Sequence, residues 1–226
     1  MRYYFAWLGS KRAAKRDVAE PGCLLDRAAN ARLPVPDGGI LLHNFYEMAL
    51  DEGIVQESDG GITAVSPQSL HDLLFSLARF PRLENKLVLR PLHHNQFGPT
   101  QPPIRPDDPA ALTNSLCESW QGQNGRHDVL LITRPQTELA GTAVSPANAE
   151  SDTIILPEGK MDLAQLARWQ RPDSSLPPHA QRLQMLLRGI RRTFGDVGWE
   201  VEWLDDGRIC WLWELKPNRS FSTDTL

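Results

Sequence analysis

Cysteine is scarce in this chain of 226 residues, which has Cys23, Cys117 and Cys210 far apart in the sequence. An odd number at such spacings gives neither a disulfide framework nor a metal-ligand pattern. We therefore expect buried, reduced thiols and a cytoplasmic protein. A long hydrophobic run is also missing, because the apolar opening at residues 1–8 is too short for a signal peptide or a membrane span and basic residues follow it at once.

Positive charge is not in excess either. The chain has 24 lysines and arginines against 28 aspartates and glutamates, which gives a formal net charge of −4. This balance offers no electrostatic attraction to nucleic acid or to an anionic membrane surface. Hydrophobic residues make up 41% of the chain, so we expect one large domain or two closely packed lobes that handle small molecules or other proteins.

Apolar periodicity and capping residues predict a mixture of helices and strands. Helices are expected at about 22–31, 44–53, 66–77, 107–120 and 178–194, with Asn44 and Ser66 as N-terminal caps. Strands are expected at 2–8, 40–42, 86–90, 129–133, 140–144 and 153–156. Because the elements do not alternate regularly as βαβ units, the class is α+β.

The strongest local signal lies near the end of the chain. Two runs rich in β-forming residues, 199–204 and 208–215, flank the turn Asp205-Asp206-Gly207. Such a pattern predicts a β-hairpin. Its tryptophans mostly alternate along the strands, which favours packing on a sheet face over a ligand site.

Three passages, in the right order, resemble the N-terminal domain of phosphoenolpyruvate synthase and pyruvate phosphate dikinase, an ATP-grasp domain. They are residues 17–47, with Leu-Pro-Val-Pro at 33–36; residues 129–146; and the hairpin with Glu-Val-Glu-Trp at 200–203 and Glu-Leu-Lys-Pro at 214–217. The resemblance implies a single shortened ATP-grasp-like domain. Its two packed α/β lobes would cover about 1–125 and 126–226, and the chain would end in a β-hairpin.

In this family two lobes close over ATP, and Mg²⁺ holds the phosphates. The resemblance implies metal ligation by Glu202 and Glu214, one on each arm of the hairpin, with Asn218 nearby. Mg²⁺ prefers oxygen ligands, and both glutamates could point the same way if the register of the hairpin allows it. The alternative is a hairpin with ordinary solvated acidic residues.

Other site residues also follow from the resemblance. Lys216 stands where the family has a phosphate-binding arginine, and Arg90 matches an arginine that contacts the transferred phosphate; a salt bridge at a strand end is the alternative for Arg90. Gly22 is the retained glycine of the nucleotide loop. The adenine hinge would fall at Ile132, Thr133 and Arg134, where backbone groups would pair with the base.

Part of the family's equipment is missing. The loop lysine has no counterpart, since Pro21 precedes Gly22, and Pro91 and Leu92 replace two serines. The swivelling domain with the phosphorylated histidine is absent from this sequence. The adjacent His93 and His94 could form a phosphohistidine or metal pair, but a surface loop is the preferred interpretation, because neighbours on an extended segment point to opposite sides.

Two functions follow as hypotheses. In the first, the domain holds Mg-ATP and passes a phosphoryl group to a histidine on a separate phosphocarrier protein, by positioning and charge neutralisation. In the second, it is a catalytically inactive descendant that serves as a binding or regulatory module. Whether the chain is an enzyme stays open at this point.

Overall fold

The computed structural model describes residues 3–76, 86–121 and 125–218. The chain divides into two compact units. Unit 1 comprises residues 1–26 and 37–134, and unit 2 comprises residues 27–36 and 135–226. The main boundary lies beyond the predicted one at about 125, because the strand at Val129–Thr133 pairs with strands of unit 1 on both of its edges.

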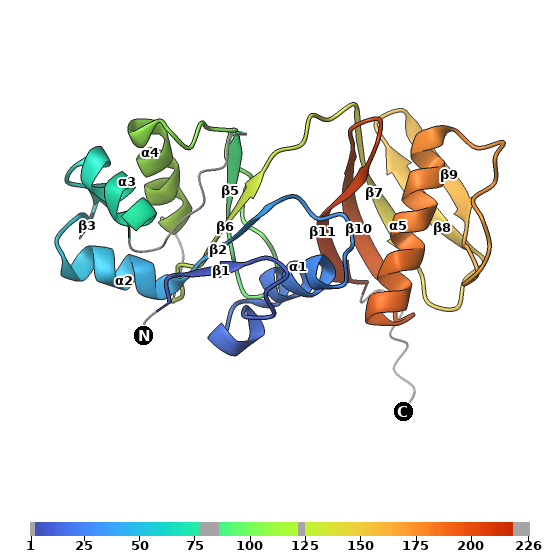
Figure 1. Ribbon diagram of the computed structural model, residues 1–226, viewed down its shortest axis with the longest axis horizontal. Helices are drawn as coiled ribbons and strands as arrows, with labels where there is room; N and C mark the ends of the chain where they lie inside the picture. The colour runs from blue at the N-terminus through green and yellow to red at the C-terminus, as the bar shows by residue number, and fades with distance from the viewer. Residues whose placement is uncertain (1–2, 77–85, 122–124, 219–226) are drawn as a thin grey trace. The chain divides into compact units, whose positions relative to one another are not determined.

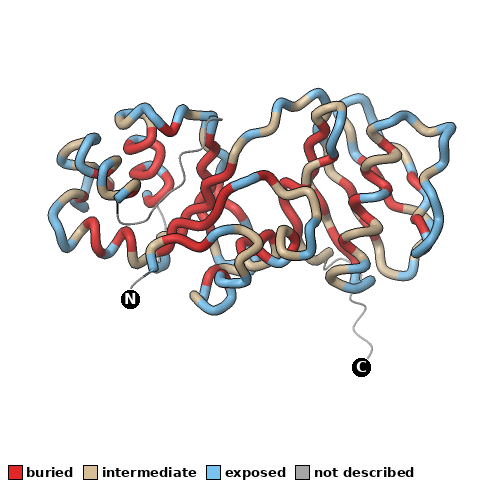
Figure 2. The backbone as a smooth tube through the Cα atoms, in the orientation of Figure 1, coloured by how far each residue is buried: buried red, intermediate tan, exposed pale blue. Residues whose placement is uncertain are grey.

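Unit 1 has a four-stranded antiparallel sheet in the order β1-β2-β6-β5. Its strands are β1 (Phe5–Trp7), β2 (Gly38–Leu41), β5 (Leu87–Pro91) and β6 (Val129–Thr133). Their residues are mostly buried, as the red stretches of the tube in Figure 2 show. Strands buried on both faces read as continuous apolar runs, which is why 86–90 and 129–133 were recognisable in the sequence.

Three helices and a hairpin complete the core of unit 1 on one face of this sheet (Figure 1). They are α2 (His43–Asp51), the hairpin of β3 (Val55–Ser58) and β4 (Gly61–Ala64), α3 (Pro67–Ser76) and α4 (Pro109–Trp120). Phe45 and Trp120 are fully buried there. A short 3₁₀ helix, η1 (Ala14–Arg16), precedes α1 (Glu20–Asn30).

Unit 2 has a five-stranded antiparallel sheet in the order β11-β10-β7-β8-β9. The strands are β7 (Leu139–Ser145), β8 (Ser151–Leu156), β9 (Gly159–Ala164), β10 (Trp199–Asp205) and β11 (Cys210–Pro217). The long helix α5 (Pro178–Phe194) runs along one face of this sheet (Figure 1). Its inward side carries Leu183, Leu187 and Ile190, each no more than 1% exposed.

Two ion pairs fasten α5 to the sheet. Arg191 donates from Nη1 to both carboxylate oxygens of the buried Asp152, at 2.9 and 3.0 Å. Arg182 forms a two-pronged pair with Asp205, at 2.8 and 2.6 Å. Two parallel hydrogen bonds fix the orientation of a guanidinium as well as its position.

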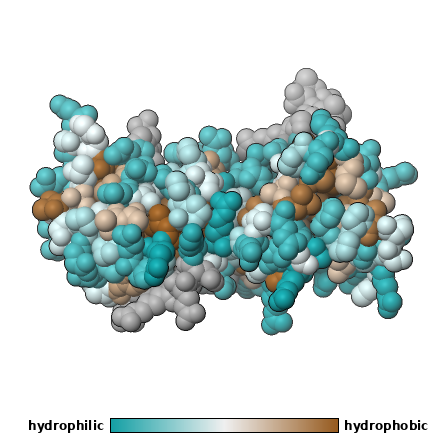
Figure 3. Space-filling model, turned by 90° about the horizontal axis from the view of Figure 1, so that it is seen from above, coloured by the Kyte–Doolittle hydropathy of each residue, from teal (hydrophilic) through white to brown (hydrophobic). Residues whose placement is uncertain are grey.

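On the face seen in Figure 3, the right half of the molecule has a patch of apolar side chains among mainly hydrophilic ones. Among its described residues, unit 2 exposes the large apolar side chains of Ile155, Trp169, Met185, Val197 and Ile209. Trp169 is the extreme case, with 85% of its surface exposed.

The predicted α+β class and the C-terminal hairpin are confirmed. α5 begins and ends at the predicted residues, and Asp108 caps α4 by accepting a hydrogen bond from the N–H of Ala111. The predicted cap Asn44 is wrong, because Leu42 is the N-cap of α2 and the Asn44 side chain donates to the carbonyl of Tyr3. β3, β4 and β9 were not predicted, and residues 2 and 77, which two predictions included, lie outside the described residues.

The core contact of α5 gives a first test. We expect Leu183→Ala to lower the free energy of unfolding by about 2–5 kcal/mol, because it removes buried methyl groups and leaves a cavity. Met185→Ala on the same helix is the matched control, since Met185 is 45% exposed and should cost much less. Urea denaturation of both variants measures the difference, and equal losses would contradict this packing.

Candidate functional site

The register of the C-terminal hairpin brings the two predicted metal ligands together. Glu202 of β10 lies directly opposite Glu214 of β11, and Glu200 lies opposite Lys216. Residues directly opposite each other in an antiparallel pair point to the same face, with Cβ atoms about 4.5–5.5 Å apart. All four side chains therefore share one face of the sheet of unit 2.

A β-bulge creates this arrangement. From the turn, Asp205 pairs with Cys210, Leu204 with Trp211 and Trp203 with Leu212, and the register then shifts between Glu202 and Trp203. Without the shift Glu214 would oppose Val201 and point to the face that packs on α5. The extra residue, Trp213, moves Glu214 and Lys216 to the face of Glu202, which is one of the known uses of a bulge.

The turn before the bulge is longer than predicted, since β11 begins at Cys210 and not at Arg208. The carboxylate of Asp206 accepts hydrogen bonds from the N–H groups of Arg208 and Ile209, at 2.8 and 2.6 Å. It also accepts one from the indole of Trp211. An aspartate that binds the backbone following it stabilises a turn in this way.

The side chains of Glu202 and Glu214 are partly shielded from solvent. Glu214 is 6% exposed and Glu202 is half-buried. Two carboxylates directly opposite each other repel, and burial increases that cost. The Nζ atom of Lys216 forms an ion pair of 2.9 Å with Glu200, and this hydrogen bond, together with the charges of Glu200, Glu214 and Glu202, raises the pKa of Lys216.

Asn218 continues the same row. Its N–H donates to the carbonyl of Gly198, at 3.1 Å, which extends the β10–β11 ladder by one step. The continued alternation places Asn218 on the face of Glu214 and Lys216. Within the described part of the chain, no three side chains of histidine, cysteine, aspartate or glutamate gather closely enough to hold a metal ion. Metal ligation by Glu202, Glu214 and Asn218 stays a prediction.

Arg90 lies in unit 1 on β5 and is 4% exposed. Its guanidinium lies over the ring of Phe97, 4.1 Å from the centroid. The salt bridge at a strand end therefore stays open as the alternative for Arg90. Contact with a transferred phosphate stays a prediction.

Gly22 does not lie in a loop, because it is the third residue of α1. A Cβ atom there would lie 2.8 Å from Val18 Cγ1 and 3.0 Å from Ile40 Cδ1. The missing side chain lets the helix approach β2, which is a packing role. A part for Gly22 in nucleotide binding stays a prediction.

Two backbone N–H groups of the predicted adenine hinge already form hydrogen bonds within unit 1. Ile132 belongs to β6, the N–H of Thr133 donates to Asp37, and the N–H of Arg134 donates to Lys86. These two N–H groups are therefore not available to a base while the bonds persist. Pairing of an adenine with the backbone here stays a prediction and would use other groups.

His93 and His94 lie on a tight surface loop, which is the interpretation preferred from the sequence. The N–H of His93 donates to the carbonyl of Gln96 there. Both line a hollow of about 670 Å³ in unit 1 with Asp17, Glu20, Arg126 and Asp128. The turn brings the two histidines to one hollow, whereas an extended segment would separate them.

Sequence reasoning missed a ring stack in unit 1. The rings of His43, Tyr46 and His127 stack on one another, with centroids 5.4 Å apart for the two histidines and 4.1 Å apart for Tyr46 and His127. Nδ1 of His43 accepts a hydrogen bond from the N–H of His127. Nδ1 of His127 is buried without a hydrogen-bond partner among the described residues. The two histidines are 84 positions apart, so no local signal linked them.

This stack predicts a pH dependence. Burial, helped by the neighbouring His43, lowers the pKa of His127, although Glu57 and Asp128 act in the opposite direction. The folded state thus favours the neutral ring. Its contribution is complete above the ordinary pKa of about 6.5 and is lost as the pH falls through the lowered pKa. We expect His127→Gln to reduce the loss of stability between pH 7 and 5 in urea denaturation.

His94→Gln is the matched control for that test, because His94 is exposed. It should leave the pH dependence as it is in the wild type. An unchanged slope in His127→Gln would show that His127 is already protonated as readily in the fold as in the unfolded chain.

No family model matches the sequence, and no curated protein matches it. Among solved structures, the fold is similar to D-alanine–D-alanine ligase from Bacillus anthracis, with 11% identity and a TM-score of 0.48 over 93% of this chain and 58% of that one. An ATP-grasp RimK domain protein from Sphaerobacter thermophilus has 14% identity and a TM-score of 0.47 over 93% of this chain and 63% of that one.

N5-carboxyaminoimidazole ribonucleotide synthetase in complex with ADP is a third similar structure, with 13% identity and a TM-score of 0.49 over 90% of this chain and 46% of that one. The chain spans about half the length of the structures it matches. The likeness says nothing about activity, and nothing in it points to phosphoenolpyruvate synthase in particular.

No described helix is long and apolar enough to cross a membrane.

Proposed function

We propose that unit 2 binds Mg-ATP on the β10–β11 face, as a nucleotide-binding domain of the phosphotransferase kind. The observation that carries the proposal is the bulged register, which sets Glu202 directly opposite Glu214 and keeps Lys216 on the same face. Three oxygen-bearing side chains, those of Glu202, Glu214 and Asn218, then share a row with one ammonium group.

The chemistry of these groups fits a magnesium nucleotide. Mg²⁺ would supply charge neutralisation to the phosphates, and the paired carboxylates would supply its protein ligands. A cation between Glu202 and Glu214 would also relieve their mutual repulsion. Lys216 would contact a phosphate oxygen as a point charge, without the two-pronged geometry of an arginine.

As an active enzyme, the protein would transfer the γ-phosphoryl group of ATP to an imidazole nitrogen of a histidine on a partner protein. A phosphorus–nitrogen bond would form, the bond between phosphorus and the β–γ bridging oxygen would break, and ADP would leave. Relation to phosphoenolpyruvate synthase and the histidine acceptor rest on the sequence resemblance alone.

The second candidate is a catalytically inactive binding or regulatory module. The packing role of Gly22, the burial of Arg90 and the absence of a loop lysine favour it. This candidate would keep the fold to bind a partner protein and does not require nucleotide, so a lack of nucleotide binding would leave it standing.

Calorimetric titration with a non-hydrolysable ATP analogue tests the nucleotide site of the first candidate. We expect Mg²⁺-dependent binding that Glu202→Gln weakens about tenfold or more, because a charge-assisted contact is worth roughly 1.5–3 kcal/mol. Glu150→Gln is the control, since Glu150 is exposed just before β8 and should bind as the wild type does. Absence of binding at millimolar nucleotide, or equal binding in both variants, would contradict the proposal.

A further inference from the structure

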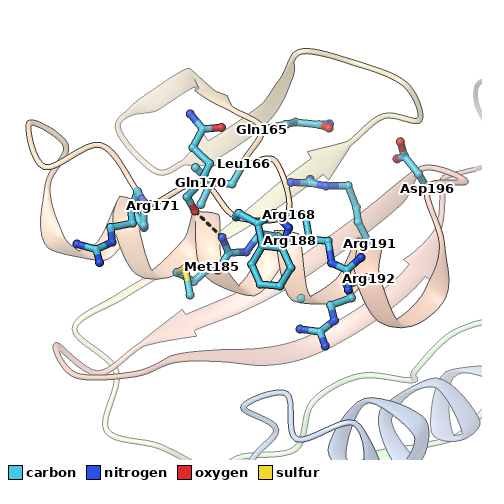
Figure 4. A pocket seen from close by; sticks show the side chains of 13 residues that line it. Gln165, Leu166, Arg168, Gln170, Arg171, Met185, Arg188, Arg191, Arg192 and Asp196 are labelled. Carbon is cyan, nitrogen blue, oxygen red and sulfur yellow. Dashed lines mark hydrogen bonds between the residues drawn. The ribbon is translucent and has the colours of Figure 1, made fainter.

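A second site lies on the side of unit 2 that α5 covers. An open hollow of about 890 Å³ lies between the β9–α5 loop and the outer side of α5 (Figure 4). It is separate from the β10–β11 face, because Glu202 and Glu214 point to the face of the sheet opposite α5. Nothing in the proposed nucleotide site accounts for it.

The hollow is strongly basic. Its lining includes five arginines, no lysine and a single carboxylate, that of Asp196; the arginines are Arg168, Arg171, Arg188, Arg191 and Arg192. Figure 4 shows Arg188, Arg191 and Arg192 on α5 and Arg168 on the loop, with Arg171 extending to one side. Of the five, Arg191 alone forms a salt bridge with a carboxylate among the described residues.

Arg191 is held in place from beneath. Its Nη1 donates to Ser145 and Asp152, and the Gln165 side chain donates to the same Asp152. The side chain is 10% exposed, and its other terminal nitrogen, Nη2, is buried without a hydrogen-bond partner in the described part of the chain. A buried guanidinium N–H that makes no bond costs free energy, so a donor oriented in this way fits an acceptor oxygen on a ligand.

An apolar side accompanies the basic one. The guanidinium of Arg168 lies 4.9 Å from the centroid of the Trp169 ring, and Trp169 and Met185 are both exposed within the lining. The Arg188 side chain points to the apolar side of the hollow, where it donates to the carbonyl of Gln170 and to the sulfur of Met185. A planar indole beside arginines provides a stacking surface next to charge.

We propose that this hollow binds a small organic phosphate, with the phosphate on Arg188, Arg191 and Arg192 and the organic part against Trp169 and Met185. The planar guanidinium of an arginine can donate two parallel hydrogen bonds to two phosphate oxygens. A phosphate carries enough negative charge to bind several arginines at once. A ligand with a single carboxylate would pair with only one of these arginines. The volume exceeds that of a phosphate ion and suits a small ligand with an organic body.

Titration in EDTA separates this site from the Mg²⁺-dependent one. The probes are 1-naphthyl phosphate and inorganic pyrophosphate. Their binding is measured by calorimetry and by the change in the indole N–H signals of an ¹⁵N-labelled protein. The Trp169 signal is assigned with Trp169→Phe. We expect naphthyl phosphate to bind and shift the Trp169 signal, and Arg188→Gln combined with Arg192→Gln to weaken it about tenfold or more.

Arg208→Gln is the matched control, because Arg208 is exposed on the hairpin turn outside the hollow, and Glu202→Gln tests independence from the nucleotide site. Both should bind as the wild type does. Equal affinity in the double variant, no binding at millimolar probe, or tighter binding of single-stranded DNA or a polyglutamate peptide through the same arginines would overturn the proposal. Loss of binding in Glu202→Gln would also overturn it.

Discussion

The pairing of β10 with its two neighbours is the constraint on which the rest of unit 2 depends. β10 is hydrogen-bonded to β7 in unbroken register and to β11 across a bulge. The unbroken side fixes which residues of β10 face α5, and the bulge then allows β11 to place Leu215 towards α5 and Glu214 away from it. A slip of one residue would exchange the apolar and acidic faces, so packing and the proposed chemistry require the same register.

Unit 2 keeps its two charged regions on opposite faces of one sheet. The face with Glu200, Glu202 and Glu214 is acidic, with Lys216 as its counter-charge, and the α5 side carries the arginine-lined hollow. Asp152 connects helix and sheet on the basic side by holding Arg191. The formal net charge of −4 conceals this separation, because it is a sum over the whole chain.

The sequence was informative wherever the signal was local. The helix at 178–194 combines an apolar face with Gly195 after its last residue, and the hairpin combines two β-rich runs with an Asp-Gly turn, so both were predictable. β9 was missed because Leu163 is its single fully buried residue and no clear alternation remains. The bulge at Trp213 has no glycine or proline to mark it, and its existence follows from packing on both faces of the sheet.

Under the proposed function, Glu202 and Glu214 together hold the metal of a bound nucleotide. A crystal structure with Mn²⁺ and a non-hydrolysable ATP analogue tests it most directly, because Mn²⁺ replaces Mg²⁺ with similar oxygen ligands and is visible by anomalous scattering. We expect an anomalous peak at coordination distance from both carboxylates and from a phosphate oxygen. A bound nucleotide whose metal lies elsewhere, with the two glutamates uninvolved, would contradict it.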